Sequence, residues 1–272
     1  MLAPKMIASD LDGTFFGKNH QPTFENLIAA KRAAELGIQL VFATGRPARW
    51  LEGLDELKPE HPRIISSNGA VIWDLQRERV LHSKLMPRDT TLEFAKELQV
   101  AMPGVNLAVE YQYGWGCTTS YKSNIYDQTG TTLVTDDLAA LIDAAPVVKL
   151  LAMHPDLHTY QMADIALPLS EGRLNGVYSM VLDSGLLEWT ALGVSKATAL
   201  EIILEETGIT SEELVAFGDM PNDIEMLNLA GHPFVMGNSH PSLLELGYPV
   251  AGLNSESGYA RTLAEILPID LG

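Results

Sequence analysis

Cysteine and positively charged residues are scarce in this chain of 272 residues. Its single cysteine, Cys117, excludes an intrachain disulfide and cannot form a cysteine-ligated zinc site by itself. Lysine and arginine together number 18, against 35 aspartates and glutamates, which gives a net charge of -17. Proteins that bind nucleic acids or anionic lipids generally present basic surfaces, so this balance argues against both functions. We therefore expect neither a nucleic-acid partner nor a membrane partner.

Long hydrophobic runs are also missing. The most apolar run, LIDAAPVVKLLAM, is interrupted by Asp143, Pro146 and Lys149, which is incompatible with a membrane-spanning helix. The residues before Asp10 lack the apolar segment of a secretory signal peptide. Together with the single cysteine, these features predict a cytoplasmic protein in a reducing compartment. The sequence leaves the oligomeric state open between a monomer and a small homo-oligomer.

The composition is that of a folded globular protein. Hydrophobic residues make up 46% of the chain and charged residues 19%, a balance that excludes extended disorder. A chain of this length can bury a sizeable core, in either one large domain or two ordinary ones. The order of local patterns decides between these.

Helix-like and strand-like segments alternate in the first part of the sequence. TFENLIAAKRAAELG begins with Thr23 as a helix N-cap and ends with Gly37 as a C-cap. Residues 6–8 before it and 38–43 after it are mostly apolar, as are strands buried on both faces of a parallel sheet. RIISSNGAVIW begins as a further strand, and its Asn68-Gly69 pair predicts a turn into a hairpin. This order predicts an α/β fold.

The pattern changes between residues 87 and 188. This segment contains a helix from about 89 to 102, an aromatic stretch, VEYQYGWGCTTSY, a short acidic helix and the strand VVKLLAM. Alternation resumes afterwards with the helix of SKATALEIILEETGI and a short buried strand at 214–217. We therefore expect a core domain of residues 1–86 and 189–272, with an α+β domain of residues 87–188 inserted into it.

Carboxylates and other polar residues follow the strands of the expected core. In IASDLDGTFF, Asp10 and Asp12 come at the end of the first strand, whose alternation would let both point the same way. The others at strand ends or helix starts are Asp219, Asp223, Thr44 and Lys196. Each aspartate alone is best explained as a turn or helix-cap residue. As a group, the aspartates would repel one another unless a cation neutralised them. Clustered carboxylate oxygens are ligands that suit Mg²⁺, and a bound Mg²⁺ would in turn favour the binding of a phosphate group.

Four segments resemble, in order, the motifs of the haloacid dehalogenase (HAD) superfamily of phosphotransferases, specifically its class IIB, Cof-type, sugar-phosphatase-like branch. They are DLDGT at 10–14, ATGR at 43–46, SK at 195–196 and GDMPND at 218–223. The resemblance covers nearly the whole chain, and the first and fourth motifs are the most specific. It implies a Rossmann-like parallel-sheet core with helices on both faces. Residues 87–188 correspond by position to the α+β cap domain of this class.

The resemblance also implies how the carboxylates act. Asp10 would attack phosphorus to form an aspartyl-phosphate, and Asp12 would be the general acid and base. Mg²⁺ would be bound by Asp10, by the main-chain carbonyl of Asp12 and by Asp219. Asp223 would be a further ligand or would orient the metal's waters.

Three other residues would bind the transferring phosphoryl group. Thr44 and Lys196 would hold its oxygens, and Lys196 would also offset the repulsion between Asp10 and the incoming dianion. Asn222 would contact the phosphoryl group or fix its neighbours. Arg46 and Asn68 lie in or near the motifs, but a surface ion pair and a simple turn explain them equally well. We therefore leave both out of the catalytic set.

These implications predict a Mg²⁺-dependent phosphatase for a small phosphorylated metabolite, with a sugar phosphate favoured. Two alternatives use similar chemistry. A phosphomutase of the same superfamily would return the phosphoryl group to a sugar and would require a bisphosphate primer. A phospho-acceptor switch resembling a response-regulator receiver would also cluster carboxylates, Thr and Lys around Mg²⁺, but would place its acceptor on a later strand and would need no cap.

Overall fold

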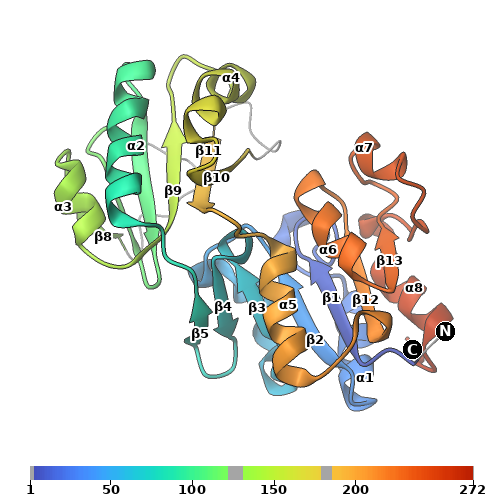
Figure 1. The fold of residues 1–272 in the computed structure, drawn as a ribbon. Coiled ribbons are helices and arrows are strands. Elements are labelled where there is room, and N and C mark those ends of the chain that lie inside the picture. Colours follow the sequence, from blue (N-terminus) through green and yellow to red (C-terminus); the bar gives the residue numbers. More distant parts are fainter. Residues whose placement is uncertain (1–2, 122–130, 179–185, 272) are drawn as a thin grey trace. The chain divides into compact units, whose positions relative to one another are not determined.

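The computed structural model describes residues 3–121, 131–178 and 186–271 of the chain (Figure 1). The chain forms two compact units, the first made of Met1–His82 and Ser195–Gly272 and the second of Ser83–Val194. The boundaries expected from the sequence were 87 and 188. A division at Glu188 would cut strand β11 (Leu186–Ala191), which pairs with strands on both of its sides. The second unit therefore takes in the whole of this strand.

A seven-stranded sheet forms the centre of the first unit, in the order β13-β12-β1-β2-β3-β4-β5 (Figure 1). The strands are β13 (His232–Val235), β12 (Leu214–Gly218), β1 (Met6–Asp10), β2 (Gln39–Ala43), β3 (Arg63–Ser66), β4 (Val71–Asp74) and β5 (Arg79–Ser83). Strands β13 to β3 pair in parallel, whereas β4 runs antiparallel to β3 after the turn at Asn68-Gly69. The α/β fold and the hairpin predicted from the sequence are confirmed.

Alternation along the apolar strands explains why helices cover both faces of this sheet. Ile7, Phe42 and Phe217 pack in one buried cluster, and Ala8 and Val41 pack in another. The first cluster includes residues of α1 (Phe24–Glu35) and α8 (Gly258–Ile266). The second includes residues of α5 (Lys196–Thr207), α6 (Ile224–Leu229) and α7 (Pro241–Leu244). Each strand thus contributes side chains to both layers.

Two of the three helix caps predicted from the sequence are confirmed, Thr23 and Gly208, whereas the C-cap of α1 is Leu36 and not the predicted Gly37. The Thr23 side chain accepts a hydrogen bond from the Asn26 N–H at the start of α1. Ser195 caps α5 in the same way, and Gly208 ends that helix with a left-handed φ of 66°. The capping of α5 fixes Lys196 as its first residue, at the edge of the sheet.

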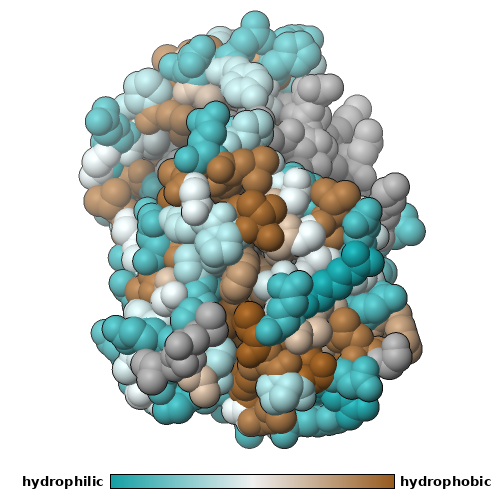
Figure 2. Space-filling model, turned by 90° about the vertical axis from the view of Figure 1, so that its right-hand side faces the viewer, coloured by the Kyte–Doolittle hydropathy of each residue, from teal (hydrophilic) through white to brown (hydrophobic). Residues whose placement is uncertain are grey.

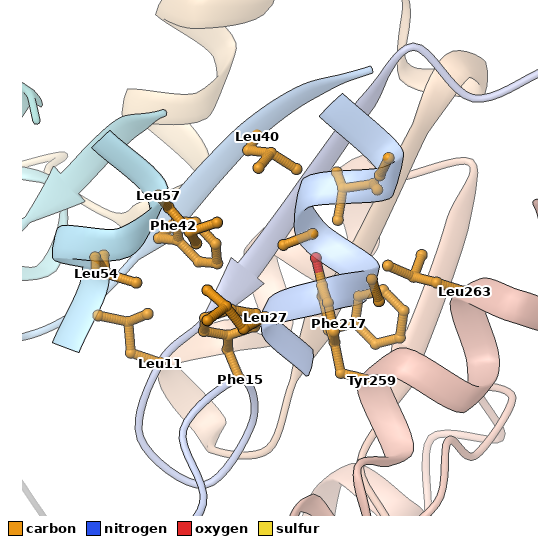
Figure 3. Packing of buried hydrophobic residues seen from close by; sticks show 14 of the residues in the cluster. Leu11, Phe15, Leu27, Leu40, Phe42, Leu54, Leu57, Phe217, Tyr259 and Leu263 are labelled. Carbon is orange, nitrogen blue, oxygen red and sulfur yellow. The ribbon is translucent and has the colours of Figure 1, made fainter. Parts of the chain in front are cut away.

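Apolar residues anchor the loop that follows β1. Leu11, Phe15 and Phe16 are all fully buried in the cluster of α1 and α8. The centre of the Phe15 ring lies 4.7 Å from that of Phe42 and 5.1 Å, edge-on, from that of Tyr259. Figure 3 shows these side chains among the buried hydrophobic residues. The polar residues between these anchors are consequently held at the end of β1.

The second unit contains a six-stranded sheet in the order β10-β11-β9-β6-β7-β8. Its strands besides β11 are β6 (Asn106–Tyr111), β7 (Trp115–Cys117), β8 (Thr131–Val134), β9 (Val147–Met153) and β10 (Leu174–Tyr178). Its helices are α2 (Arg88–Ala101), α3 (Leu138–Asp143) and α4 (Thr159–Ser170). Alternate side chains of β6, β9 and β11 pack with these helices in one cluster, with Trp189 fully buried. This unit therefore has its own hydrophobic core.

Short 3₁₀ segments complete the described chain. They are Lys18–His20, Ala48–Trp50, Glu52–Glu60, Ser67–Gly69, Ser211–Glu213, Pro221–Asp223 and Asn254–Glu256. No helix in the described ranges is long and apolar enough to cross a membrane.

Some hydrophobic side chains are exposed at the surface of the first unit. Leu244, Leu246, Val250 and Leu253 are each at least 40% exposed. Figure 2, which views the side of α7 and α8, shows brown hydrophobic patches. The acidic composition therefore does not make the surface uniformly hydrophilic.

A buried ion pair links two strands of the second unit. Lys149 on β9 donates to the carboxylate of Glu188 on β11 at 2.7 Å, and Lys149 is 1% exposed. Replacing Lys149 by methionine would leave a carboxylate buried without this cation, so we expect the free energy of unfolding to fall by about 3–5 kcal/mol. Urea denaturation would measure the loss, with exposed Lys96→Met as a control that changes stability little. Equal stabilities of the two variants would contradict the expectation.

Candidate active site

The ends of three neighbouring parallel strands bring the candidate residues to one edge of the sheet. Strand β1 ends with Asp10, Thr44 follows the last residue of β2, and Asp219 follows the last residue of β12. Asp10 pairs in register with Ala43, directly before Thr44. Because these strands lie in the order β12-β1-β2, the three polar residues meet at the carboxyl edge, where α/β sheets bind ligands.

Three buried aspartates form a cluster at this edge. Asp10, Asp219 and Asp223 can each offer an oxygen such that these atoms lie within 4.8 Å of one another. The Lys196 ammonium donates to Asp10 at 2.5 Å and to Asp223 at 2.6 Å, and its side chain is 2% exposed. Lys196 therefore supplies a buried positive charge between two of the three acids.

Burial and mutual repulsion make ionisation of this cluster costly. Burial raises the pKa of Asp10 well above its usual value, and the charges of Asp223 and Asp219 add to this rise, while Lys196 opposes it. Burial, followed by the charge of Asp223, raises the pKa of Asp219 to about 7. One lysine thus leaves the three acids short of positive charge. An oxygen-only donor set with excess negative charge fits Mg²⁺.

Asp223 accepts hydrogen bonds from the backbone as well as from Lys196. Its other carboxylate oxygen accepts hydrogen bonds from the backbone N–H groups of Asp219 and Met220, both at 3.0 Å. These bonds fix the turn after β12 and hence the position of the Asp219 side chain. The geometry favours an orienting role for Asp223 over direct ligation.

Gly13 and Thr14 hold the loop after β1 against Asp219. Thr14 donates its hydroxyl proton to the Asp219 carboxylate at 2.9 Å. Gly13 has φ of 86°, and a Cβ atom at this position would lie 2.2 Å from an Asp219 carboxylate oxygen. A side chain at position 13 is thus excluded by both conformation and space.

Asp12 lies apart from this cluster. Strand β1 ends at Asp10, so the expected strand alternation does not place Asp12, which lies in the loop. Its carboxylate accepts from Arg46 Nε at 2.7 Å and from Arg46 Nη2 at 2.5 Å, and lies 3.0 Å from His20 Nδ1. Burial alone would raise the pKa of Asp12, but the hydrogen bonds and charge of Arg46 outweigh it and lower this pKa. Arg46 is therefore a partner of Asp12.

Thr44 and Asn222 are the remaining candidate residues, and each has a hydrogen-bond partner in the first unit. Thr44 is buried, and its hydroxyl oxygen accepts from the Arg46 backbone N–H at 3.1 Å. The Asn222 side chain donates to the Asn68 side chain at 3.5 Å. Gly69, at φ of 107°, lies so close to α5 that a Cβ atom would be 2.1 Å from the Ser195 carbonyl oxygen. The Asn68 turn therefore abuts the start of the helix that carries Lys196.

Sequence reasoning missed several of these contacts. The motifs predict neither the hydrogen bond from Thr14 to Asp219 nor the pairing of Arg46 with Asp12. They also do not include Asn238, whose side chain donates to the Gly13 carbonyl at 2.8 Å. Asn238 comes shortly after β13, another parallel strand, so the same strand-end signal that identified Asp219 could have found it.

The sequence matches a family model described as haloacid dehalogenase-like hydrolase over residues 7–263. HMP-PP phosphatase of Cronobacter sakazakii is 30% identical, over 96% of this chain and 94% of that protein. The 5-amino-6-(5-phospho-D-ribitylamino)uracil phosphatase of Bacillus subtilis is 26% identical, over 95% and 94%. These matches favour an enzyme over a phospho-acceptor switch.

Solved structures show the same fold. A haloacid dehalogenase-like hydrolase from Bacteroides thetaiotaomicron matches with a TM-score of 0.79 and 25% identity, over 97% of this chain and all of that one. A HAD subclass IIB sugar phosphatase matches with a TM-score of 0.79 at 22% identity, over 97% of this chain and 100% of that one. The chain therefore belongs to the haloacid dehalogenase-like hydrolase family, as a HAD-type phosphatase with the class IIB fold.

Proposed function

We propose that this protein is a Mg²⁺-dependent phosphatase that hydrolyses a small phosphorylated metabolite through an aspartyl-phosphate on Asp10. The observation that carries the proposal is the buried cluster of Asp10, Asp219 and Asp223 around Lys196 at the carboxyl edge of the sheet. A carboxylate held beside a buried ammonium and other acids has the groups that phosphoryl transfer uses.

Asp10, Asp219 and the main-chain carbonyl of Asp12 would hold the metal, with Asp223 orienting its surroundings. Bound Mg²⁺ would supply positive charge that draws the phosphoryl dianion and the carboxylates together. Lys196 would share this task, because its ammonium already touches Asp10. Thr44 and Asn222 would donate hydrogen bonds to the phosphoryl oxygens.

The reaction would proceed in two displacements. A carboxylate oxygen of Asp10 attacks phosphorus while Asp12 gives a proton to the leaving alkoxide. Asp12 then takes a proton from a water molecule that attacks the aspartyl-phosphate, which releases phosphate and restores Asp10. The separate surroundings of the two acids suit these different tasks, since only Asp10 lies in the cluster.

The names of two relatives support the proposed substrate class. Two are named as phosphatases of small phosphorylated compounds, HMP-PP and a phosphoribityl-aminouracil, which supports a small metabolite, with a sugar phosphate favoured. A panel of metabolite phosphates assayed for phosphate release would test this, with turnover expected to stop in excess EDTA. Full turnover in EDTA would refute the metal role, and a requirement for a bisphosphate primer would favour a mutase.

The proposed location is the cytoplasm.

The stabilising effect of Mg²⁺ should depend on pH. Folding raises the pKa of Asp219 from 3.8 to about 7, so the metal-free folded chain binds more protons than the unfolded chain between these values. Stability of the metal-free protein should therefore fall as the pH rises through this window. Mg²⁺ binds the ionised carboxylates, so its stabilisation should grow over the same range.

Melting temperatures with Mg²⁺ and with EDTA would measure this effect. We expect the difference between them to be larger at about pH 8 than at about pH 5. The variant Asp219→Asn serves as the matched control and should lose most of this dependence. A difference that stays constant with pH would contradict the metal assignment.

A further inference from the structure

Arg46 donates two parallel hydrogen bonds to the carboxylate of Asp12. Its Nε donates to Oδ2 at 2.7 Å and its Nη2 donates to Oδ1 at 2.5 Å. This fork defines the plane and the direction of a carboxylate, which a single charge on a lysine does not. The contact joins residues 34 positions apart in the sequence.

Arg46 is itself firmly placed. Its guanidinium lies 5.2 Å from the centre of the buried Phe16 ring, and its Nη1 donates to the Trp50 carbonyl at 3.3 Å. Its backbone N–H donates to Thr44 Oγ1, and its carbonyl accepts from Ser67 at 2.9 Å. The side chain is only 18% exposed. Arg46 is therefore fixed by several elements of the first unit.

Asp12 lacks comparable support. It lies in the loop beyond β1, and its side chain is 40% exposed. Its other neighbour, His20, has a side chain that is 71% exposed. The direction in which the Asp12 carboxylate points thus depends mainly on Arg46.

The contacts also distinguish the two carboxylate oxygens. Each oxygen has two lone pairs. Oδ1 faces both Arg46 Nη2 and His20 Nδ1, whereas Oδ2 accepts only from Arg46 Nε within the described ranges. Oδ2 is therefore the oxygen with a lone pair left for a proton.

We propose that Arg46 is a positioning residue that aims Oδ2 of Asp12 at the group with which it exchanges a proton. This inference rests on the proposed function, in which Asp12 is the acid and base. Arg46 acts through Asp12 and does not bind the phosphoryl group. Loss of orientation removes most of the benefit of a general acid or base, which is typically about 10² to 10⁴-fold in rate.

The test compares formation and breakdown of the aspartyl-phosphate in the full-length protein. Rapid mixing with an activated aryl phosphate and acid quench, followed by intact-mass measurement, gives both rates. We expect Arg46→Met to form the adduct within a few-fold of the wild-type rate, because this leaving group needs little protonation. Breakdown should slow by about 10²-fold.

A double-mutant cycle shows whether Arg46 acts through Asp12. The double variant Arg46→Met/Asp12→Asn should break down the adduct no more slowly than Asp12→Asn alone, since the same interaction is lost. Multiplied effects in the double variant would overturn the proposal. Slow adduct formation in Arg46→Met would also overturn it, because Arg46 would then act on the phosphoryl group.

Two further variants distinguish the orienting effect of the Arg46 guanidinium from its charge and from a general disturbance of the local structure. Arg46→Lys should recover only part of the breakdown rate, because lysine keeps the charge but lacks the fork. Arg49→Met is the matched control, since the Arg49 guanidinium stacks over Trp50 in the same 3₁₀ segment, and it should behave as wild type. Full recovery with lysine, or an equal defect in Arg49→Met, would overturn the proposal. Absence of any adduct in the wild type would instead refute the proposed function.

Discussion

Replacing Asp10 by asparagine is expected to reduce phosphate release to background. The attacking oxygen is lost, and no described acid can take its place. Asp219 is held by Thr14, and Asp223 is held by Lys196 and two backbone N–H groups. No covalent intermediate should then form, and intact-mass measurement after acid quench should show an unmodified chain. Retained phosphate release in this variant would refute Asp10 as nucleophile.

Asp12→Asn is the matched control for this result, because it keeps the nucleophile and the main-chain carbonyl. It should lose proton transfer, worth typically about 10² to 10⁴-fold. With an activated ester it should still form the aspartyl-phosphate and turn it over slowly. Failure to detect any adduct under these conditions would contradict the division of tasks between the two aspartates.

Replacing Lys196 by methionine is expected to have the second-largest effect, on both rate and stability. The ammonium is 2% exposed and touches Asp10 and Asp223, so its removal leaves buried carboxylates without their cation. We expect the free energy of unfolding of the metal-free protein to fall by about 3–5 kcal/mol. Turnover with Mg²⁺ should fall by about 10³-fold, because a preorganised charge next to the transferring phosphoryl group is lost.

Mg²⁺ separates these two consequences. It should restore part of the lost stability, since it can neutralise the same carboxylates, but it should not restore the rate. Urea denaturation with and without Mg²⁺ gives the first quantity, and steady-state phosphate release gives the second. Exposed Lys96→Met, in the second unit, should change neither. Unchanged turnover in Lys196→Met would refute its role in binding the phosphoryl group.

Local sequence patterns were sufficient for much of the fold. Apolar runs predicted β1 and β2, because a strand buried on both faces is mostly apolar. Thr23 predicted the start of α1, since a capping hydroxyl acts within its own turn. The end of the inserted unit was harder to place, because β11 belongs to it only through pairing with β9 and β10.

The sequence by itself determined which polar residues follow the strands of a parallel sheet, and hence that Asp10, Thr44 and Asp219 belong to one edge. Only the tertiary structure decided which side chains of the site contact one another. Arg46 meets Asp12 across 34 residues, Asn222 meets Asn68 across 154, and Thr14 meets Asp219 across 205. These contacts depend on the strand order β12-β1-β2 and on loop conformations anchored by the core. Strand order and loop anchoring are set by packing between distant segments, which no local pattern encodes.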